Sequence, residues 1–114
     1  MKKTNIKNFK KTLSKFITGI TVVCVKKNNK IYGKTVNSFN SLSLKPPLVL
    51  FSLGNYSSSL NVFSESKYLS INILSKNQKK ISECFSGKKP VADSSNFEEI
   101  NENVYLINGC IANL

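Results

Sequence analysis

The sequence predicts a mainly β (α+β) fold, a small antiparallel β-barrel with short peripheral helices, formed by one domain over residues 1–114. Three observations predict it. Five apolar segments have the composition or the alternation of strands, a turn signal joins the first two segments into a hairpin, and short stretches of helical periodicity lie between others. A length of 114 residues is ordinary for a single domain.

The chain is expected to begin with an amphipathic helix that leads into a hairpin. Apolar residues recur at spacings of three and four, and Gly19 should end the helix; the apolar positions are Ile6, Phe9, Leu13, Phe16 and Ile17. The β-branched run at 20–25 predicts a buried strand. A turn at 27–29 and a return strand at 30–36 complete the hairpin.

A polar segment at 37–45 is expected to be a loop that precedes a core strand. Between Thr35 and Lys45, six of the eleven side chains are hydroxyls or amides. Pro46 and Pro47 then favour an extended chain, so a strand is expected over 48–53. The polar segment is either an ordinary turn or a cradle for a polar, anionic ligand.

The next segments predict a short helix and a half-buried strand. A turn at 54–56 is followed by serines at 57–59, which suit the N-cap of a helix that carries Leu60 and Phe63. In the strand at 68–74, apolar side chains alternate with serine and asparagine, so we expect one face to be buried.

The last third predicts a helix, a long loop and a final strand. Ser75 and Gln78 have the spacing of a capping box, and the helix that they open should end at Gly87. Residues 87–103 have no clear period and predict a loop. Residues 104–112 predict a strand that can leave an unpaired sheet edge.

The net charge of +11 comes from seventeen basic residues that are all lysine. Direct base readout favours the arginine fork, so we do not expect a sequence-specific DNA-binding protein or another nucleic-acid partner. A lysine-coated surface is the plain interpretation, and a positive field would also attract phosphorylated small molecules.

The cysteines and the hydropathy point to a cytoplasmic protein without a membrane partner. Cys24, Cys84 and Cys110 are widely spaced in apolar surroundings, and we expect buried reduced thiols rather than a disulfide framework or a zinc site. The chain has no histidine, and no metal site is visible among its acidic residues. No apolar run is long enough to span a bilayer.

Three motifs give the chain a specific resemblance. The first is a helix ending in F-x-T-G-x-T-V-V, a motif that runs from Phe16 to Val23. A G-x-T-V-N-S-F-x-S-x-S-L-x-P-P-L-V segment runs from Gly33 to Val49, and an N-x-L-S-x-x-Q helix entry runs from Asn72 to Gln78. Together they resemble the flavin reductase domain with an FMN-binding split barrel of the antiparallel Greek-key type, the reductase component of two-component flavin monooxygenases.

The resemblance implies an NAD(P)H-dependent flavin reductase that binds FMN, with FAD or riboflavin as the alternative flavin. A hydride would pass from the nicotinamide of NADH or NADPH to the flavin, no protein acid or base would be needed, and reduced FMN would be supplied to a partner monooxygenase. The resemblance also implies a homodimer, the usual assembly of the family. The implied flavin-binding residues are Thr35, Val36, Asn37, Ser38, Phe39, Ser41, Ser43, Ser52, Leu53, Gly54, Ser58, Ser59, Phe85 and Ser86.

Other interpretations of these residues stay open. The polar segment can be a turn, Phe85 can belong to the core, and Lys88 and Lys89 can lie in a solvated loop or bind the flavin phosphate. Members of the family also carry a later Gly-Asp-His segment near the nicotinamide, which this sequence lacks. We therefore expect a C-terminally truncated domain, with a non-catalytic FMN-binding protein or an inactive fragment as the alternative function.

Overall fold

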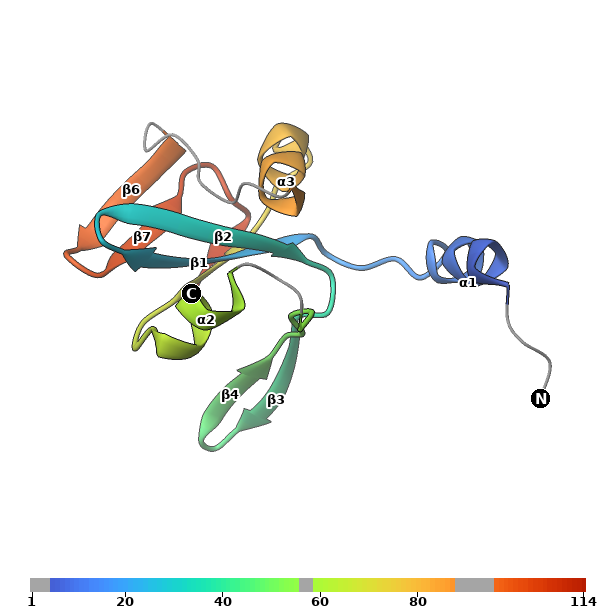
Figure 1. Cartoon of the computed structure of the whole chain (residues 1–114), viewed down its shortest axis with the longest axis horizontal. Coiled ribbons are helices and arrows are strands. Elements are labelled where there is room, and N and C mark those ends of the chain that lie inside the picture. Colours follow the sequence, from blue (N-terminus) through green and yellow to red (C-terminus); the bar gives the residue numbers. More distant parts are fainter. Residues whose placement is uncertain (1–4, 56–58, 88–95) are drawn as a thin grey trace.

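The computed structural model describes residues 5–55, 59–87 and 96–114, and its strand pairings are all antiparallel. The fold is mainly β with a few helices, as predicted (Figure 1). In chain order the elements are α1 (Ile6–Leu13), β1 (Thr21–Lys27), β2 (Lys30–Val36), β3 (Asn40–Leu44), β4 (Pro47–Leu50), α2 (Leu60–Glu65), β5 (Ser70–Ile73), α3 (Lys79–Ser86), β6 (Phe97–Asn101), β7 (Val104–Ile107) and β8 (Ala112–Asn113).

The first hairpin is confirmed with its turn. β1 and β2 pair over seven residues each, and Lys27 lies opposite Lys30. Asn28 and Asn29 have φ angles of 52° and 59°, the left-handed conformation that a tight two-residue hairpin turn requires and that asparagine tolerates. The hairpin forms half of a four-stranded sheet in the order β2-β1-β5-β8.

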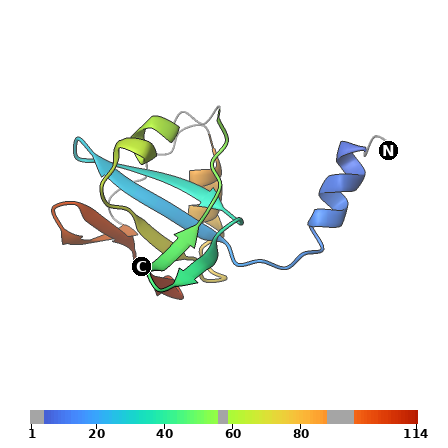
Figure 2. The ribbon, with the colours of Figure 1, turned by 90° about the horizontal axis from the view of Figure 1, so that it is seen from below.

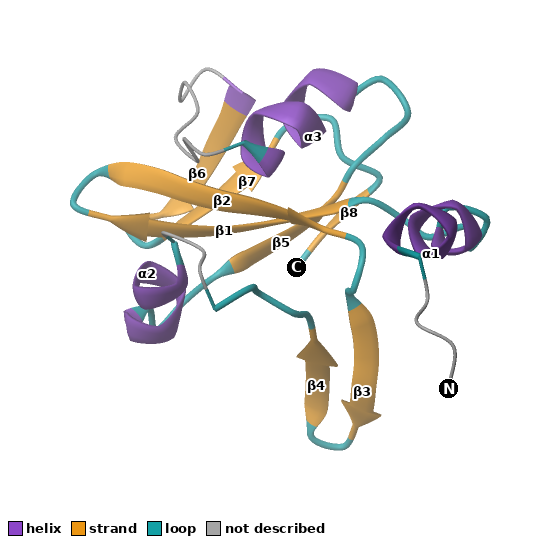
Figure 3. Cartoon of the chain, turned by 45° about the vertical axis from the view of Figure 1, so that its right-hand side comes forward, coloured by secondary structure: helices purple, strands orange, loops and turns teal. Residues whose placement is uncertain are grey.

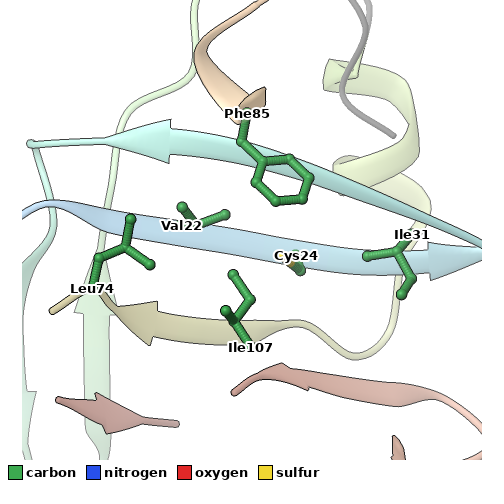
Figure 4. Close-up of a cluster of buried hydrophobic side chains, with 6 residues drawn as sticks. All are labelled: Val22, Cys24, Ile31, Leu74, Phe85 and Ile107. Atoms are coloured by element: carbon green, nitrogen blue, oxygen red, sulfur yellow. The ribbon is translucent and has the colours of Figure 1, made fainter. Parts of the chain in front are cut away.

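Strand β1 is buried on both faces, which explains its unbroken apolar sequence. Val22 and Cys24 belong to one core cluster, with Phe85 from α3 and Ile107 from β7 (Figure 4). The side chains that alternate with them join a second cluster, which includes Phe63 from α2. The two clusters place α3 and α2 on opposite faces of the sheet.

The strand predicted at 68–74 exists as β5, but both of its faces are covered. Asn72 is fully buried and Ser70 is 2% exposed, so the expectation of one solvent-facing side is wrong. The reason is that polar side chains can enter a core when they are hydrogen-bonded. The hydroxyl of Ser70 donates to the carbonyl of Tyr105 at 2.6 Å.

Residues 37–45 are not one loop, because β3 begins at Asn40 and pairs with β4. The serine–leucine alternation at 41–44 is the two-residue period of a strand. The segment was predicted as a loop because its hydroxyl content is high. The strand expected over 48–53 ends at Leu50 and is exposed, with β3 and β4 forming a projecting hairpin rather than core (Figure 3).

The loop expected over 87–103 contains strand β6, which pairs with β7. Most of β6 is exposed, so its sequence carries no hydrophobic period. The strand expected over 104–112 is divided into β7 and β8. Gly109 lies between them with a φ of +76°, a conformation that glycine adopts readily and that interrupts the extended chain.

Helix α1 forms as predicted but ends at Leu13, with Ser14 as its C-cap, well before Gly19. The side-chain oxygen of Asn5 accepts a hydrogen bond from the Lys7 N–H at 2.8 Å and caps the helix N-terminus. A segment at 14–20 without helix or strand then leads to β1. In two views at right angles α1 lies apart from the body of the molecule (Figures 1 and 2).

Helix α3 begins one residue after the predicted capping box. The side-chain oxygen of Gln78 accepts from the backbone N–H of Ser75 at 2.9 Å, as in such a box. Its amide nitrogen donates to the carbonyl of Asn108 at 2.7 Å, which ties the helix entry to the loop after β7. Gly87 is the C-cap, as predicted. In the described ranges, no helix has the length and apolar character that a membrane crossing requires.

Candidate functional site

Two adjoining hollows lie where strand β2 ends and the polar segment begins. The larger hollow has a volume of about 570 Å³ and the smaller hollow about 430 Å³. The larger is lined by Leu13, Ser14, Phe16, Ile17, Thr18, Ile20, Thr35, Val36, Asn37 and Ser82. The smaller is lined by Phe16, Thr18, Gly19, Thr21, Asn37, Ser38, Phe39, Asn40 and Ile73. Both volumes are in the range of small-molecule sites.

The hollows share a wall formed by Phe16, Thr18 and Asn37. Phe16 and Thr18 come from the segment before β1, and Asn37 follows the end of β2. Because β1 and β2 pair with Thr21 opposite Val36, the hairpin register brings the two segments together. The predicted run from Thr35 to Phe39 therefore lines one hollow or the other.

Ser38 joins the polar segment to the chain after β4. Its hydroxyl oxygen accepts a hydrogen bond from the backbone N–H of Ser52 at 2.8 Å. Phe39 and Leu53 both pack against the second core cluster. The structure thus brings two predicted groups of residues side by side, and the Ser38 hydroxyl keeps its own hydrogen for a further acceptor.

Thr35 and Ser86 meet at one carbonyl oxygen. The hydroxyl of Thr35 donates to the Ser82 carbonyl at 2.7 Å, and the hydroxyl of Ser86 donates to the same carbonyl at 2.7 Å. These bonds fix the end of β2 against α3. Both hydroxyl oxygens retain lone pairs that can accept a hydrogen bond.

Phe85 is placed in the core rather than at a hollow. Its side chain is 1% exposed and lines neither hollow. The ring packs directly over Gly33 of β2 and edge-to-face against Phe97, with 6.1 Å between ring centroids. Phe85 therefore lies in the core, as the alternative interpretation of the sequence expected. Its contact with flavin stays a prediction.

Ser41, Ser43, Gly54 and Ser59 line neither hollow. Ser41 and Ser43 are on β3, in the projecting hairpin. Gly54 is exposed, and Ser59 is 2% exposed just before α2. Ser58 lies outside the described residues, as do Lys88 and Lys89.

Sequence reasoning missed several lining residues, namely Phe16, Thr18, Thr21, Ser82 and Ile73. Three of them belong to the F-x-T-G-x-T motif, which carried the resemblance but was given no ligand-binding role. The position of Thr18 and Thr21 within that motif was the available signal for them. Ser82 gave no signal, because only the packing of α3 against β2 brings it to the larger hollow.

The linings of both hollows consist of apolar, hydroxyl, amide and glycine residues and contain no charged side chain. Neither hollow therefore offers a protein group for acid–base chemistry at neutral pH. Among the described residues, no group of three or more histidine, cysteine or acidic side chains is placed to hold a metal ion.

A third hollow, of about 370 Å³, lies at the opposite end of β1 and includes Lys26, Lys27 and Lys67 in its lining. Two of these lysines already have partners. Lys27 forms an ion pair with Glu65, and the ammonium of Lys26 lies 3.8 Å from a carboxylate oxygen of Glu99. Because these charges are compensated locally, this hollow is a weaker candidate for an anionic ligand than its lysines suggest.

The three cysteines are free thiols in different environments. Cys24 is buried, Cys110 is partly buried and Cys84 is exposed, so the expectation of three buried thiols holds for Cys24 but is wrong for Cys84. Burial, with a smaller contribution from Cys110, raises the pKa of Cys24 to about 12, although a hydrogen bond with Ser70 opposes the shift. Burial also raises the pKa of Cys110.

Comparison with known protein families gives a match to the family described as "Flavin reductase like domain" over residues 13–114. Among curated proteins, the chain is 39% identical over 108 residues to "FMN reductase (NADH) SmoA" of Agrobacterium fabrum, which covers 95% of this chain and 62% of that protein. It is 34% identical over 80 residues to "4-hydroxyphenylacetate 3-monooxygenase, reductase component" of Thermus thermophilus, covering 70% of this chain and 54% of that protein. The chain thus spans less than two thirds of either relative.

Solved structures give the same result for the fold. The flavin reductase PheA2 superposes with a TM-score of 0.82 at 34% identity, over 96% of this chain and 71% of that one. The NADH:FAD oxidoreductase SgcE6 of Streptomyces globisporus, "in complex with NAD and FAD fragments", gives a TM-score of 0.84 at 27% identity, over 100% of this chain and 72% of that one.

Proposed function

The chain belongs to the flavin reductase like domain family, and from this membership we propose that it is an NAD(P)H-dependent flavin reductase that uses FMN. The observation that carries the proposal is the match over residues 13–114, together with the run from Thr35 to Asn40, which lines the two hollows at the end of β2. The names of two relatives, which specify FMN and NADH, support this pair of substrates.

The residues at the hollows suit a flavin chemically. Asn37 can donate and accept at a polar ring edge, Phe39 offers an aromatic surface, and Ser38 retains a hydroxyl hydrogen after accepting from Ser52. We place the flavin ring in the smaller hollow and the nicotinamide donor beside it. FAD and riboflavin are the alternative flavins.

Bound flavin supplies the redox chemistry by accepting a hydride from the nicotinamide, and the chain's own residues bind and orient the two reactants. The uncharged linings of the hollows are consistent with these separate roles of flavin and protein. Hydride transfer needs alignment of the reactants and exclusion of water rather than a protein acid or base. Thr35 holds the end of β2 against α3 through the Ser82 carbonyl. The flavin contacts predicted at Leu53, Gly54, Phe85 and the remaining serines are also part of the proposal; these serines are Ser41, Ser43, Ser52, Ser58, Ser59 and Ser86.

We further propose that the reduced flavin serves a partner monooxygenase, since several relatives are named as reductase components of monooxygenases. A homodimer and a cytoplasmic location complete the proposal. The free state of all three cysteines is consistent with a reducing compartment.

The test is NADH oxidation by the purified chain, followed as the loss of nicotinamide absorbance with and without FMN. Oxidation that requires FMN and saturates with its concentration is the expected result. Saturable FMN binding without oxidation of NADH or NADPH would contradict the reductase and select the alternative, a non-catalytic FMN-binding protein. Sedimentation velocity of the same sample tests the homodimer.

A further inference from the structure

The turn between β7 and β8 contains the one Asn-Gly pair of the sequence. Of the fifteen asparagines, Asn108 alone is followed by glycine. Both residues lie in a turn and are exposed, and Gly109 has a φ of +76°. Asparagine is among the thermolabile residues, because its side-chain carbonyl carbon can react with the backbone nitrogen of the next residue. Glycine has no Cβ to obstruct that nitrogen.

The two groups that can react with each other are free of hydrogen bonds. Asn108 uses its backbone instead: its N–H donates to the Asn96 carbonyl at 2.9 Å, and its carbonyl accepts from the Gln78 side chain at 2.7 Å. Among the residues that the structure describes, neither the Asn108 side-chain amide nor the Gly109 N–H has a hydrogen-bond partner. The amide can therefore turn towards the nitrogen without breaking a hydrogen bond.

We propose that Asn108 is a site of spontaneous deamidation, which converts it to aspartate or isoaspartate. The backbone nitrogen of Gly109 bonds to Cγ of Asn108, the bond from Cγ to the side-chain nitrogen breaks, and ammonia leaves with the proton of the backbone nitrogen. The product is a cyclic imide. Water then adds to either ring carbonyl and opens the ring, which leaves a carboxylate. No group is oxidised or reduced, and water is the only other reactant.

Other asparagines of the chain lack this combination of features. Asn61 is also exposed, but it lies in α2 and precedes Val62, whose β-branched side chain crowds the backbone nitrogen. Asn72 is fully buried, and its side-chain nitrogen and oxygen are both hydrogen-bonded. Asn108 should therefore react before either of them. It lines neither hollow, so the inference is independent of the proposed function.

The reaction would alter the connection from β7 to β8. This connection is fixed at both ends, because the Asn108 N–H donates to Asn96 and the Ile111 N–H donates to the Ile73 carbonyl at 2.8 Å. In isoaspartate the main chain runs through the side-chain carbons, so it is one methylene longer between these two points. The carbonyl that accepts from Gln78 becomes part of a free carboxylate outside the main chain. We expect the pairing of β8 and the link to α3 to weaken.

The test follows the purified full chain over several days at neutral and at mildly alkaline pH. Isoelectric focusing should show a growing acidic species, because a neutral amide becomes a carboxylate. Peptide mapping by mass spectrometry should place the change at Asn108, and in isotopically labelled water the new carboxyl group should carry the label. Conversion should be faster at the higher pH, since the deprotonated nitrogen is the nucleophile.

Asn108→Gln keeps the amide and the same backbone groups, but it moves the side-chain carbonyl carbon one methylene further from the main chain. It should form no acidic species, whereas Asn61→Gln, the matched control, should form it at the rate of the parent chain. An acidic species that persists in Asn108→Gln, equal conversion of Asn61 and Asn108, or no conversion would each overturn the proposal.

Urea unfolding tests the structural consequence on the same samples. After incubation the parent chain should unfold at a lower urea concentration than fresh chain, because the connection to β8 has lengthened. The unfolding midpoint of Asn108→Gln should not change over the same time. A converted parent chain with an unchanged midpoint would overturn the expected weakening of β8 and of the link to α3.

Discussion

At the scale of single residues, the contact between Gly33 and Phe85 leaves no room for a side chain on β2. A Cβ atom placed on Gly33 would lie 2.5 Å from Cε1 of the Phe85 ring, a separation that real side chains do not tolerate. The missing side chain of Gly33 lets α3 approach β2 closely. Because Thr35 lies two residues further along β2, this packing also helps to position the larger hollow.

Gly33→Ala should therefore destabilise the fold by about 1–3 kcal/mol through overpacking. The midpoint of urea unfolding measures the loss. Gly19→Ala is the control, because no atom outside its chain neighbours lies within 4 Å of the position that its Cβ would take, and it should change the free energy of unfolding by less than about 0.5 kcal/mol. Unchanged stability of Gly33→Ala would show that the ring moves aside without cost.

The buried thiol of Cys24 predicts a pH dependence of stability. Its pKa is raised from 9.0 to about 12 in the folded chain by burial, so the folded state keeps the proton that the unfolded state releases. The stabilising contribution is complete below pH 9 and is lost as the pH rises towards 12, at about 1.4 kcal/mol per pH unit.

Urea unfolding at a series of pH values between 9 and 12 tests this contribution against two variants. Cys24→Ala should have a shallower decline in stability than the parent chain, because the titrating group is gone. Cys84→Ala should decline as steeply as the parent, since Cys84 is exposed and its removal leaves the buried thiol in place. Identical slopes for the parent and Cys24→Ala would refute the assignment.

At the scale of the elements, Asn72 joins strands that lie far apart in the sequence. Its amide nitrogen donates to the Val22 carbonyl at 3.0 Å, and its oxygen accepts from the Ile107 N–H at 2.9 Å. The same oxygen accepts from the Asn113 side chain at 2.8 Å. One fully buried side chain thus connects β5 with β1, β7 and β8.

Asn72→Leu should destabilise the fold by about 3 kcal/mol or more, because it leaves several buried polar groups without partners. The midpoint of urea unfolding again provides the measurement. Asn61→Leu, at an exposed position of α2, is the control and should stay within about 0.5 kcal/mol of the parent. A small effect of Asn72→Leu would mean that other contacts hold β7 and β8 in place.

The sequence predicted elements well where local signals agree with packing. The β1–β2 hairpin has β-branched residues, a double asparagine turn and burial on both faces, so pattern and structure coincide. Strand β6 was missed because its side chains are mostly exposed. The alternation of polar and apolar residues in β5 predicted that Asn72 faces solvent. Such a pattern cannot reveal that β7 covers the polar face of the strand.

At the scale of the whole molecule, the candidate site combines segments that the sequence separates. The run from Thr35 to Phe39 could be predicted from its composition and resemblance, and it lines the hollows. The contributions of Thr18 and Ser82 could not be predicted, because they depend on how the segment before β1 and helix α3 meet the end of β2. Local pattern identifies which residues can bind, and packing decides which of them face a hollow.

The measurement that tests the central claim most directly is the titration of FMN with purified chain, followed by quenching of flavin fluorescence. We predict saturable quenching by the parent chain and by Ser64→Leu, a control at an exposed position of α2. We predict none by Ser38→Leu, because a bulky apolar side chain would fill the smaller hollow, while circular dichroism remains unchanged. No quenching by the parent chain, or equal affinity for Ser38→Leu, would contradict the account.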